Sequence, residues 1–127
     1  MTTLPDERQR LLLVDDEPTN LQVLRHVLQA DYRLLFATDG ARALQVAREQ
    51  LPQLILLDIM MPGMDGYDTM RAIRTNPERR MLPMIALTAK AMKGDRERCL
   101  EAGASDYVAK PVVTDQLLGV LRQWLQR

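Results

Sequence analysis

Short aliphatic runs alternate along the chain with longer segments that mix apolar and polar residues. The aliphatic runs have the length and composition of β-strands, and they lie at residues 10–14, 32–36, 53–57, 83–87 and 106–110. The segments between them repeat apolar residues every three or four positions, which is typical of amphipathic helices. These segments lie at residues 21–28, 41–50, 67–75, 91–104 and 114–127. The pattern predicts five consecutive strand–helix units joined by short loops.

Strands that alternate with helices specify a parallel sheet with helices on both faces. Right-handed crossovers and only five strands favour a flavodoxin-like α/β fold, a doubly wound sheet of strand order 2-1-3-4-5. A closed barrel would need eight strands. The last helix is expected to begin after Thr114 as its N-cap. Ligands of such sheets bind beyond the carboxyl ends of the strands, so the residues at those ends are the candidates for function.

Charged and polar residues stand at four of the five strand ends. Asp15 and Asp16 follow the first strand, Asp58 follows the third, Thr88 follows the fourth, and Lys110 ends the fifth. Three carboxylates with one ammonium leave an excess of negative charge, which raises carboxylate pKa values or drives the groups apart. A hard divalent cation such as Mg²⁺ relieves this excess, because it binds one or two carboxylates together with water and phosphate oxygens.

A carboxylate beside a metal can also act as a nucleophile towards phosphorus and form an aspartyl phosphate. The Thr88 hydroxyl and the Lys110 ammonium are then suitable partners for phosphoryl oxygens. Phosphoryl transfer requires mainly such positioning and charge neutralisation. We therefore expect Asp58 to end a buried strand because a rigid element has to present it to a metal and a phosphorus atom.

The motifs around these residues resemble a known family, the receiver domains of two-component response regulators. They are LLLVDDEP, LLDIMMPGMDGY, ALTAKAMKGD and GASDYVAKPV, and they span essentially the whole chain. The resemblance implies an N-terminal tail at residues 1–9 and a receiver domain at residues 10–127. It also implies a phosphorelay function, in which Asp58 accepts a phosphoryl group from phosphohistidine in the presence of Mg²⁺. Such a chain is a signalling domain that catalyses transfer only to its own aspartate, not an enzyme with a separate substrate.

The resemblance further implies a role for each residue of the metal site. Asp58 resembles the phosphoacceptor, which is also a metal ligand. Asp16 resembles the direct Mg²⁺ ligand, Asp15 the ligand that acts through water, and the Met60 carbonyl a backbone ligand. Met60 and Lys90 also stand where the family flanks the approach of water to phosphorus. A thioether and an ammonium orient water poorly or not at all, so we expect slow self-dephosphorylation.

The remaining roles concern the switch. Thr88 and Lys110 resemble the residues that contact the phosphoryl oxygens, and Tyr107 resembles the aromatic residue that rotates inward when Thr88 moves. Lys110–Pro111 matches the family's cis peptide bond, and Ala89 matches the small residue that leaves room for the phosphoryl group. The implied output surface consists of the fourth helix, the fifth strand and the fifth helix, through which a homodimer could also form.

Composition narrows the setting of this function. Seventeen basic residues balance seventeen acidic ones, so no net field favours direct binding to nucleic acid or to an anionic membrane. The one cysteine excludes an intramolecular disulfide and fits a reducing compartment. No signal peptide and no apolar run of about 20 residues is present. We expect a cytoplasmic protein whose partner is a histidine kinase or a histidine phosphotransfer domain.

Two other classes of function compete with this interpretation. An aspartate-nucleophile phosphatase would carry an Asp-x-Asp pattern after the first strand, and none follows Val14. An unphosphorylated binding module on the same fold would usually lack one of the acids or the lysine, and all are present here. At 127 residues we expect one domain, with no room in this chain for an output domain. The sequence leaves open whether it is a stand-alone regulator, the receiver of a hybrid kinase, or the receiver of a cyclic-dinucleotide enzyme.

Overall fold

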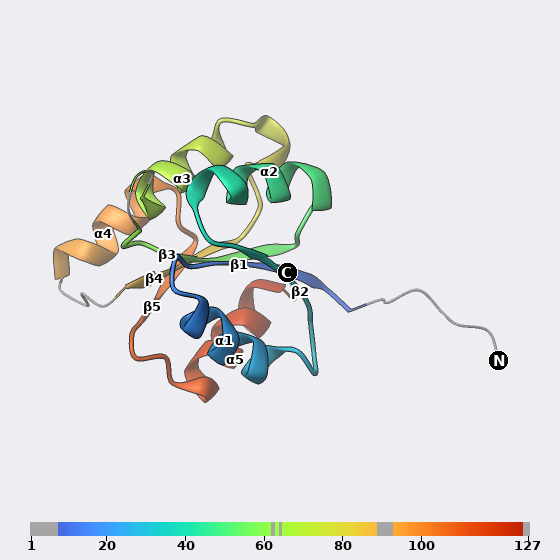
Figure 1. Ribbon diagram of the computed structural model, residues 1–127. Helices are drawn as coiled ribbons and strands as arrows, with labels where there is room; N and C mark the ends of the chain where they lie inside the picture. Colours follow the sequence, from blue (N-terminus) through green and yellow to red (C-terminus); the bar gives the residue numbers. More distant parts are fainter. Residues whose placement is uncertain (1–7, 62, 64, 89–92, 126–127) are drawn as a thin grey trace.

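The computed structural model describes residues 8–61, 63, 65–88 and 93–125, which form a three-layer α/β domain (Figure 1). Its single sheet has five parallel strands in the order β2-β1-β3-β4-β5. The strands are β1 (Arg10–Val14), β2 (Arg33–Ala37), β3 (Leu54–Asp58), β4 (Met84–Thr88) and β5 (Asp106–Ala109). The predicted doubly wound, flavodoxin-like topology is therefore confirmed.

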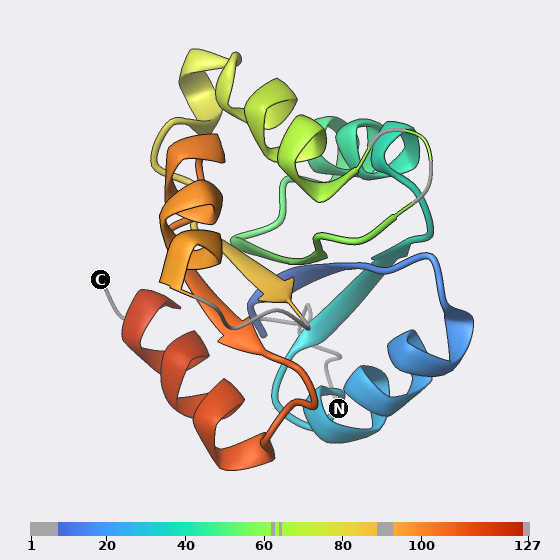
Figure 2. The same cartoon turned by 90° about the vertical axis from the view of Figure 1, so that its left-hand side faces the viewer.

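Helices cover both faces of this sheet. They are α1 (Pro18–Leu28), α2 (Gly40–Gln50), α3 (Gly66–Arg74), α4 (Lys93–Ala102) and α5 (Thr114–Leu125), with a short 3-10 helix, η1 (Pro77–Arg79), after α3. Helices α1 and α5 lie on one face, and α2, α3 and α4 lie on the other (Figures 1 and 2). None of the helices among the described residues combines the length and apolar composition that crossing a bilayer requires.

Three strands lie one residue further along the chain than predicted. The pattern ended the third and fourth strands at their last aliphatic residue, but Asp58 and Thr88 continue the ladder as the last residues of β3 and β4. Pro83 cannot begin β4 as a ladder donor because it has no N–H. Tyr32 precedes β2 because its N–H donates to the Leu28 carbonyl at 3.1 Å and closes the end of α1. Asp58 and Thr88 therefore lie within the strands and not in the loops that follow them.

Several helix ends also differ from the prediction, and the backbone explains two of these differences. Thr114 is the first residue of α5 and not its N-cap. The Leu117 N–H donates to the Val113 carbonyl at 3.0 Å, so the hydrogen bonds of the helix already begin at Val113. Helix α4 ends at Ala102, two residues earlier than predicted, because Gly103 adopts a left-handed conformation (φ +119°) that stops a helix.

Two apolar layers fix the central strands. Leu11 and Leu13 of β1 pack towards α1 and α5, whereas Leu12 and Val14 pack towards α2, α3 and α4. All five residues of β3 are buried, including Asp58. Each fully buried leucine stabilises the fold by about 2 kcal/mol. The strands that carry the acidic residues are therefore held rigidly from both sides.

Candidate functional site

Asp58 is presented at the end of the buried strand β3. Its side chain is almost fully buried, and one carboxylate oxygen, Oδ1, lies 3.1 Å from the Lys110 ammonium. The same oxygen accepts the Met60 N–H at 3.2 Å. Gly66, the first residue of α3, packs so closely here that an added Cβ would lie 2.6 Å from the Asp58 carbonyl oxygen. Only glycine fits this contact, which brings α3 against the end of β3.

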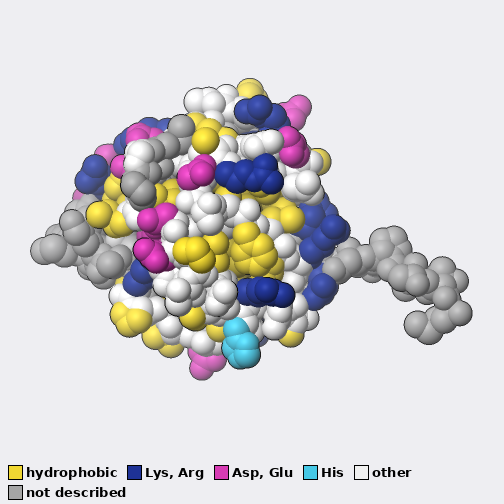
Figure 3. Space-filling view, in the orientation of Figure 1, with side chains coloured by type: hydrophobic (Ala, Val, Ile, Leu, Met, Phe, Trp, Pro, Cys, Tyr) yellow, Lys and Arg dark blue, Asp and Glu magenta, His cyan; other side chains and the backbone are white. Residues whose placement is uncertain are grey.

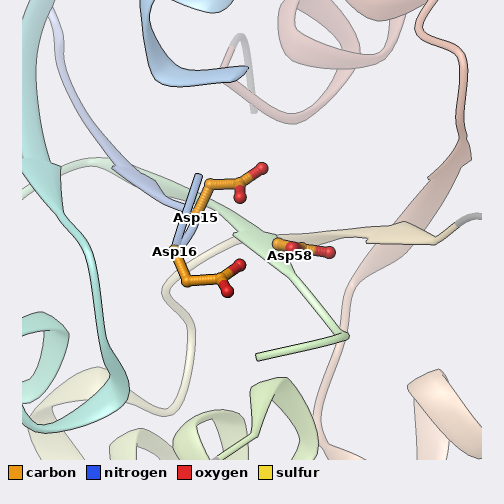
Figure 4. A group of neighbouring side chains, drawn as sticks. All are labelled: Asp15, Asp16 and Asp58. Atoms are coloured by element: carbon orange, nitrogen blue, oxygen red, sulfur yellow. The ribbon is translucent and has the colours of Figure 1, made fainter. Parts of the chain in front are cut away.

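Asp15 and Asp16 follow β1 and face Asp58. Asp15 is completely buried; its Oδ1 accepts the Glu17 N–H at 2.9 Å, and its Oδ2 lies 3.5 Å from the Lys110 ammonium. Asp16 is only half-buried. The three carboxylates each contribute an oxygen to a cluster in which all of these oxygens lie within 4.8 Å of one another. Figure 4 shows them together at the ends of β1 and β3.

The charge of this cluster opposes the ionisation of Asp58. Burial raises the pKa of Asp58, and the negative charge of Asp15 raises it further, while the hydrogen bond from Lys110 lowers it. One ammonium shared between two buried carboxylates leaves negative charge uncompensated. The site therefore favours an added cation.

The donor set fits Mg²⁺, which prefers carboxylate oxygens in a compact arrangement. Both oxygens of Asp15 are engaged by Glu17 and Lys110. Within the part of the chain that the structure describes, the Asp16 carboxylate has neither a hydrogen bond nor an ion pair, so its oxygens are more accessible to a metal. This difference agrees with the unequal roles that the family resemblance implies for the two acids.

The other predicted residues lie around the same end of the sheet. Thr88 is buried at the end of β4, and its carbonyl accepts the Lys110 N–H at 2.8 Å. The Lys110–Pro111 peptide bond is cis, as the resemblance implies. Tyr107 is half-buried in β5, and the Met60 side chain is 60% exposed. The role of the Met60 carbonyl as a metal ligand stays a prediction.

Ala89 and Lys90, which the sequence placed beside the phosphoryl group, lie outside the described residues. Sequence reasoning also missed a contact of the predicted switch residue: the Arg96 guanidinium of α4 lies 5.9 Å from the centre of the Tyr107 ring. This distance is at the outer range of a cation–π interaction. The only sign of this contact in the sequence was an arginine in the first turn of α4, a mostly polar helix that directly precedes β5.

The fold and the site together define a class of protein. Residues 11–122 match the model of the response regulator receiver domain, and the chain belongs to this family. Receiver domains are signalling domains of two-component systems, and they interact with histidine kinases or phosphotransfer proteins.

Three relatives illustrate the likeness. The response regulator PleD of Caulobacter vibrioides is 44% identical over 104 residues, which are 81% of this chain but 23% of PleD. The polar-differentiation response regulator DivK of Brucella anthropi is 34% identical over 91% of this chain and 94% of DivK. The receiver domain of the sensor histidine kinase PA1611 of Pseudomonas aeruginosa, solved with a magnesium ion in its active-site cleft, superimposes with a TM-score of 0.87 at 41% identity, covering 94% of this chain and 99% of that one.

Proposed function

We propose that this domain accepts a phosphoryl group from a phosphohistidine onto Asp58, with Mg²⁺ held by Asp15, Asp16, Asp58 and the Met60 carbonyl. One observation carries the proposal: a buried carboxylate lies 3.1 Å from an ammonium and within 4.8 Å of two further carboxylates. A buried acid with surplus acids around it is destabilising, so its presence at this position supports a chemical role. The magnesium ion in the PA1611 receiver supports the choice of metal.

The chemistry follows from the positions of the side chains. An oxygen of the ionised Asp58 attacks phosphorus, the P–N bond of phosphohistidine breaks, and the imidazole leaves with the electron pair and takes up a proton. Lys110 stabilises the ionised carboxylate before attack and a phosphoryl oxygen after it, because its ammonium already lies beside Asp58. The buried Thr88 at the end of β4 supplies a hydroxyl to a second oxygen. Bound Mg²⁺ would supply positive charge for the transferring group.

The switch would transmit this local change to the surface. A phosphoryl group adds charge at the ends of β3, β4 and β5, which draws Thr88 and Lys110 towards it and makes room for Tyr107 to rotate inward. Tyr107 is half-buried and contacts Arg96 of α4. We therefore place the output on the α4–β5–α5 surface, through which the phosphorylated domain could also form a homodimer.

The limits and setting of the domain complete the proposal. We assign residues 10–127 to the receiver domain and residues 1–9 to a tail, which the start of β1 at Arg10 and the family match at 11–122 support. The donor is a histidine kinase or a histidine phosphotransfer domain of the cytoplasm. The domain itself is a signalling module without a separate substrate, and it binds neither membrane nor nucleic acid directly.

Transfer from phosphorylated kinases tests this function. Purified histidine kinases and phosphotransfer domains, each labelled on histidine with radioactive phosphate, are mixed with the chain in Mg²⁺. We expect label to move from at least one donor to wild type and from none to Asp58→Asn. Asp65→Asn is the matched control, because Asp65 is a nearby acid whose side chain caps α3 by accepting the Asp68 N–H. This variant should be labelled as strongly as wild type. Equal labelling of Asp58→Asn and wild type would contradict the proposal.

A further inference from the structure

A groove of about 470 Å³ runs between the C-terminal half of α1 and the outer edge of β2. None of its lining residues belongs to the acidic cluster: they come from α1, the loop between α1 and β2, β2 itself, and the segment before β1. Strand β2 pairs only with β1 among the described strands, so its other edge is open. We call this site the β2-edge groove.

The backbone of β2 offers unpaired groups to this groove. The Arg33 N–H donates to the Gln9 carbonyl at 3.0 Å, and the Ala37 carbonyl accepts the Asp15 N–H at 3.1 Å. Arg33 and Ala37, the first and last residues of β2, therefore both form backbone hydrogen bonds on the side of β1. Because the backbone of a strand alternates with a two-residue repeat, the N–H and C=O groups of Leu34 and Phe36 point to the open edge. These two residues also line the groove.

The charge of the groove is positive. Arg8, Arg25 and Arg33 line it, and none of the described lining residues is acidic, although Asp31 lies next to the lining residue Tyr32 in the sequence. Arg8 donates to the Gln29 carbonyl at 2.7 Å. Arg25 and Arg33 are exposed and have no ion pair or side-chain hydrogen bond within the described residues. Asp31 is close enough for its charge to act on Tyr32, so it offsets part of this positive charge.

The same groove exposes apolar surface. Phe36 is 40% exposed and Leu34 is half-buried, on the face of the sheet that α1 covers. Figure 3 looks onto the open edge of the sheet and shows a hydrophobic patch with basic side chains above, below and to its right, and acidic side chains to its left. An exposed aromatic residue in the same groove as Arg25 and Arg33 is an anchor suited to recognition, since aromatic and arginine side chains dominate the energetics of interfaces.

We propose that the β2-edge groove binds an extended acidic segment of a partner protein, which adds a sixth strand to the open edge of the sheet. The segment's backbone would pair with Leu34 and Phe36, an apolar side chain would cover Phe36, and flanking carboxylates would meet Arg25 and Arg33. A second copy of this chain is a poor occupant, because pairing two β2 edges would bring the arginines of both copies together. The binding is independent of the phosphoryl chemistry at Asp58.

A short peptide tests this surface. The probe is a fluorescein-labelled nonapeptide with two glutamates at each end and alternating valine and threonine between them, and fluorescence anisotropy reports its binding. We expect the double variant Arg25→Glu/Arg33→Glu to bind at least about tenfold more weakly than wild type. The matched control is Arg48→Glu, which reverses an exposed arginine of α2 outside the groove and should change the affinity less than about twofold. Asp58→Asn should bind as wild type does.

The backbone pairing has its own signature. Amide hydrogen exchange followed by NMR should slow at Leu34 and Phe36 when the probe binds, and should stay unchanged at Arg33 and Leu35, which already face β1. A probe with proline at its central position should lose this protection. The proposal is overturned if charge reversal leaves the affinity unchanged, or if no edge amide gains protection. Preferential binding of single-stranded oligouridine to the same arginines would equally overturn it, since a nucleic acid cannot extend the sheet.

Discussion

Replacing Asp58 with asparagine should stabilise the metal-free protein. Asparagine keeps the volume of the side chain and can still accept the Met60 N–H through its amide oxygen, so the change removes mainly the negative charge. That charge is unfavourable where it lies, since burial and Asp15 both raise the pKa of Asp58. The variant therefore separates the electrostatic strain of the site from its packing.

The magnitude follows from the distances. At the 4.8 Å limit of the cluster and an effective dielectric constant of about 20, each like-charged pair costs about 3.5 kcal/mol. With the same dielectric constant, the attraction between the Lys110 ammonium and Asp58 at 3.1 Å stabilises the ionised carboxylate by about 5 kcal/mol. Burial of Asp58, the largest cause of its raised pKa, adds to the repulsion by Asp15, and together they outweigh the attraction of Lys110 by about 1–2 kcal/mol. For a domain of this size that raises the melting temperature by about 3–10 °C.

The effect should depend on pH and on metal. Because the folded-state pKa of Asp58 is raised, the wild type loses stability relative to the variant as pH rises from the ordinary carboxyl pKa through the raised one. The difference should vanish in acid, where the carboxyl is protonated in both states. Added Mg²⁺ should reduce the stability difference between the two proteins, because the wild type gains more binding free energy than a variant that lacks one acidic ligand.

Differential scanning calorimetry in EDTA at neutral pH, repeated in acid and in Mg²⁺, measures all three effects. Glu101→Gln is the control, since it removes an exposed carboxylate of α4 without touching the cluster. If Asp58→Asn melts at or below the temperature of wild type in EDTA at neutral pH, the charge of the cluster is not the strain that we infer.

Three further outcomes follow from the roles of individual residues. Asp16→Ala should weaken Mg²⁺ binding more than Asp15→Ala does, because both oxygens of Asp15 are already engaged; calorimetric titration with equal affinities would contradict this. Lys110→Ala should still become phosphorylated slowly, yet NMR shifts around Tyr107 on adding beryllofluoride should disappear; wild-type shifts would disprove the coupling. Met60→Asn should shorten the lifetime of the phosphoaspartate, since an exposed amide can orient water; an unchanged decay would show that this side chain does not set the lifetime.

The sheet order and the cluster were predictable because they depend on local patterns. Aliphatic runs of strand length indicate the order of the elements, and parallel strands bring their carboxyl ends to one edge of the sheet. The sequence alone therefore predicts that Asp58 and Lys110 lie together, as they do. The glycines of PGMDG also indicate special backbone geometry in the turn before α3. Gly66 indeed contacts the end of β3, and Gly63 adopts a positive φ of 74°.

Contacts between distant side chains were not predictable. The half-buried guanidinium of Arg74 donates to the Gly103 carbonyl at 2.9 and 3.0 Å and to the Arg79 carbonyl at 2.8 Å, joining α3, η1 and the end of α4. Its position in a polar helix carries no sign of this role. The indole of Trp124 likewise donates to Asp106 at 3.1 Å. Such contacts depend on how side chains reach across elements, which the spacing of apolar residues does not encode.

The covalent state of Asp58 tests the central claim most directly. Wild type, Asp58→Asn and Asp65→Asn are incubated with acetyl phosphate and Mg²⁺ and then weighed by intact-mass spectrometry. We predict that wild type and Asp65→Asn gain the mass of one phosphoryl group, that Asp58→Asn gains none, and that EDTA abolishes the gain. Labelling of Asp58→Asn equal to that of wild type, or labelling undiminished by EDTA, would contradict the assignment of Asp58 as a metal-dependent phosphoacceptor.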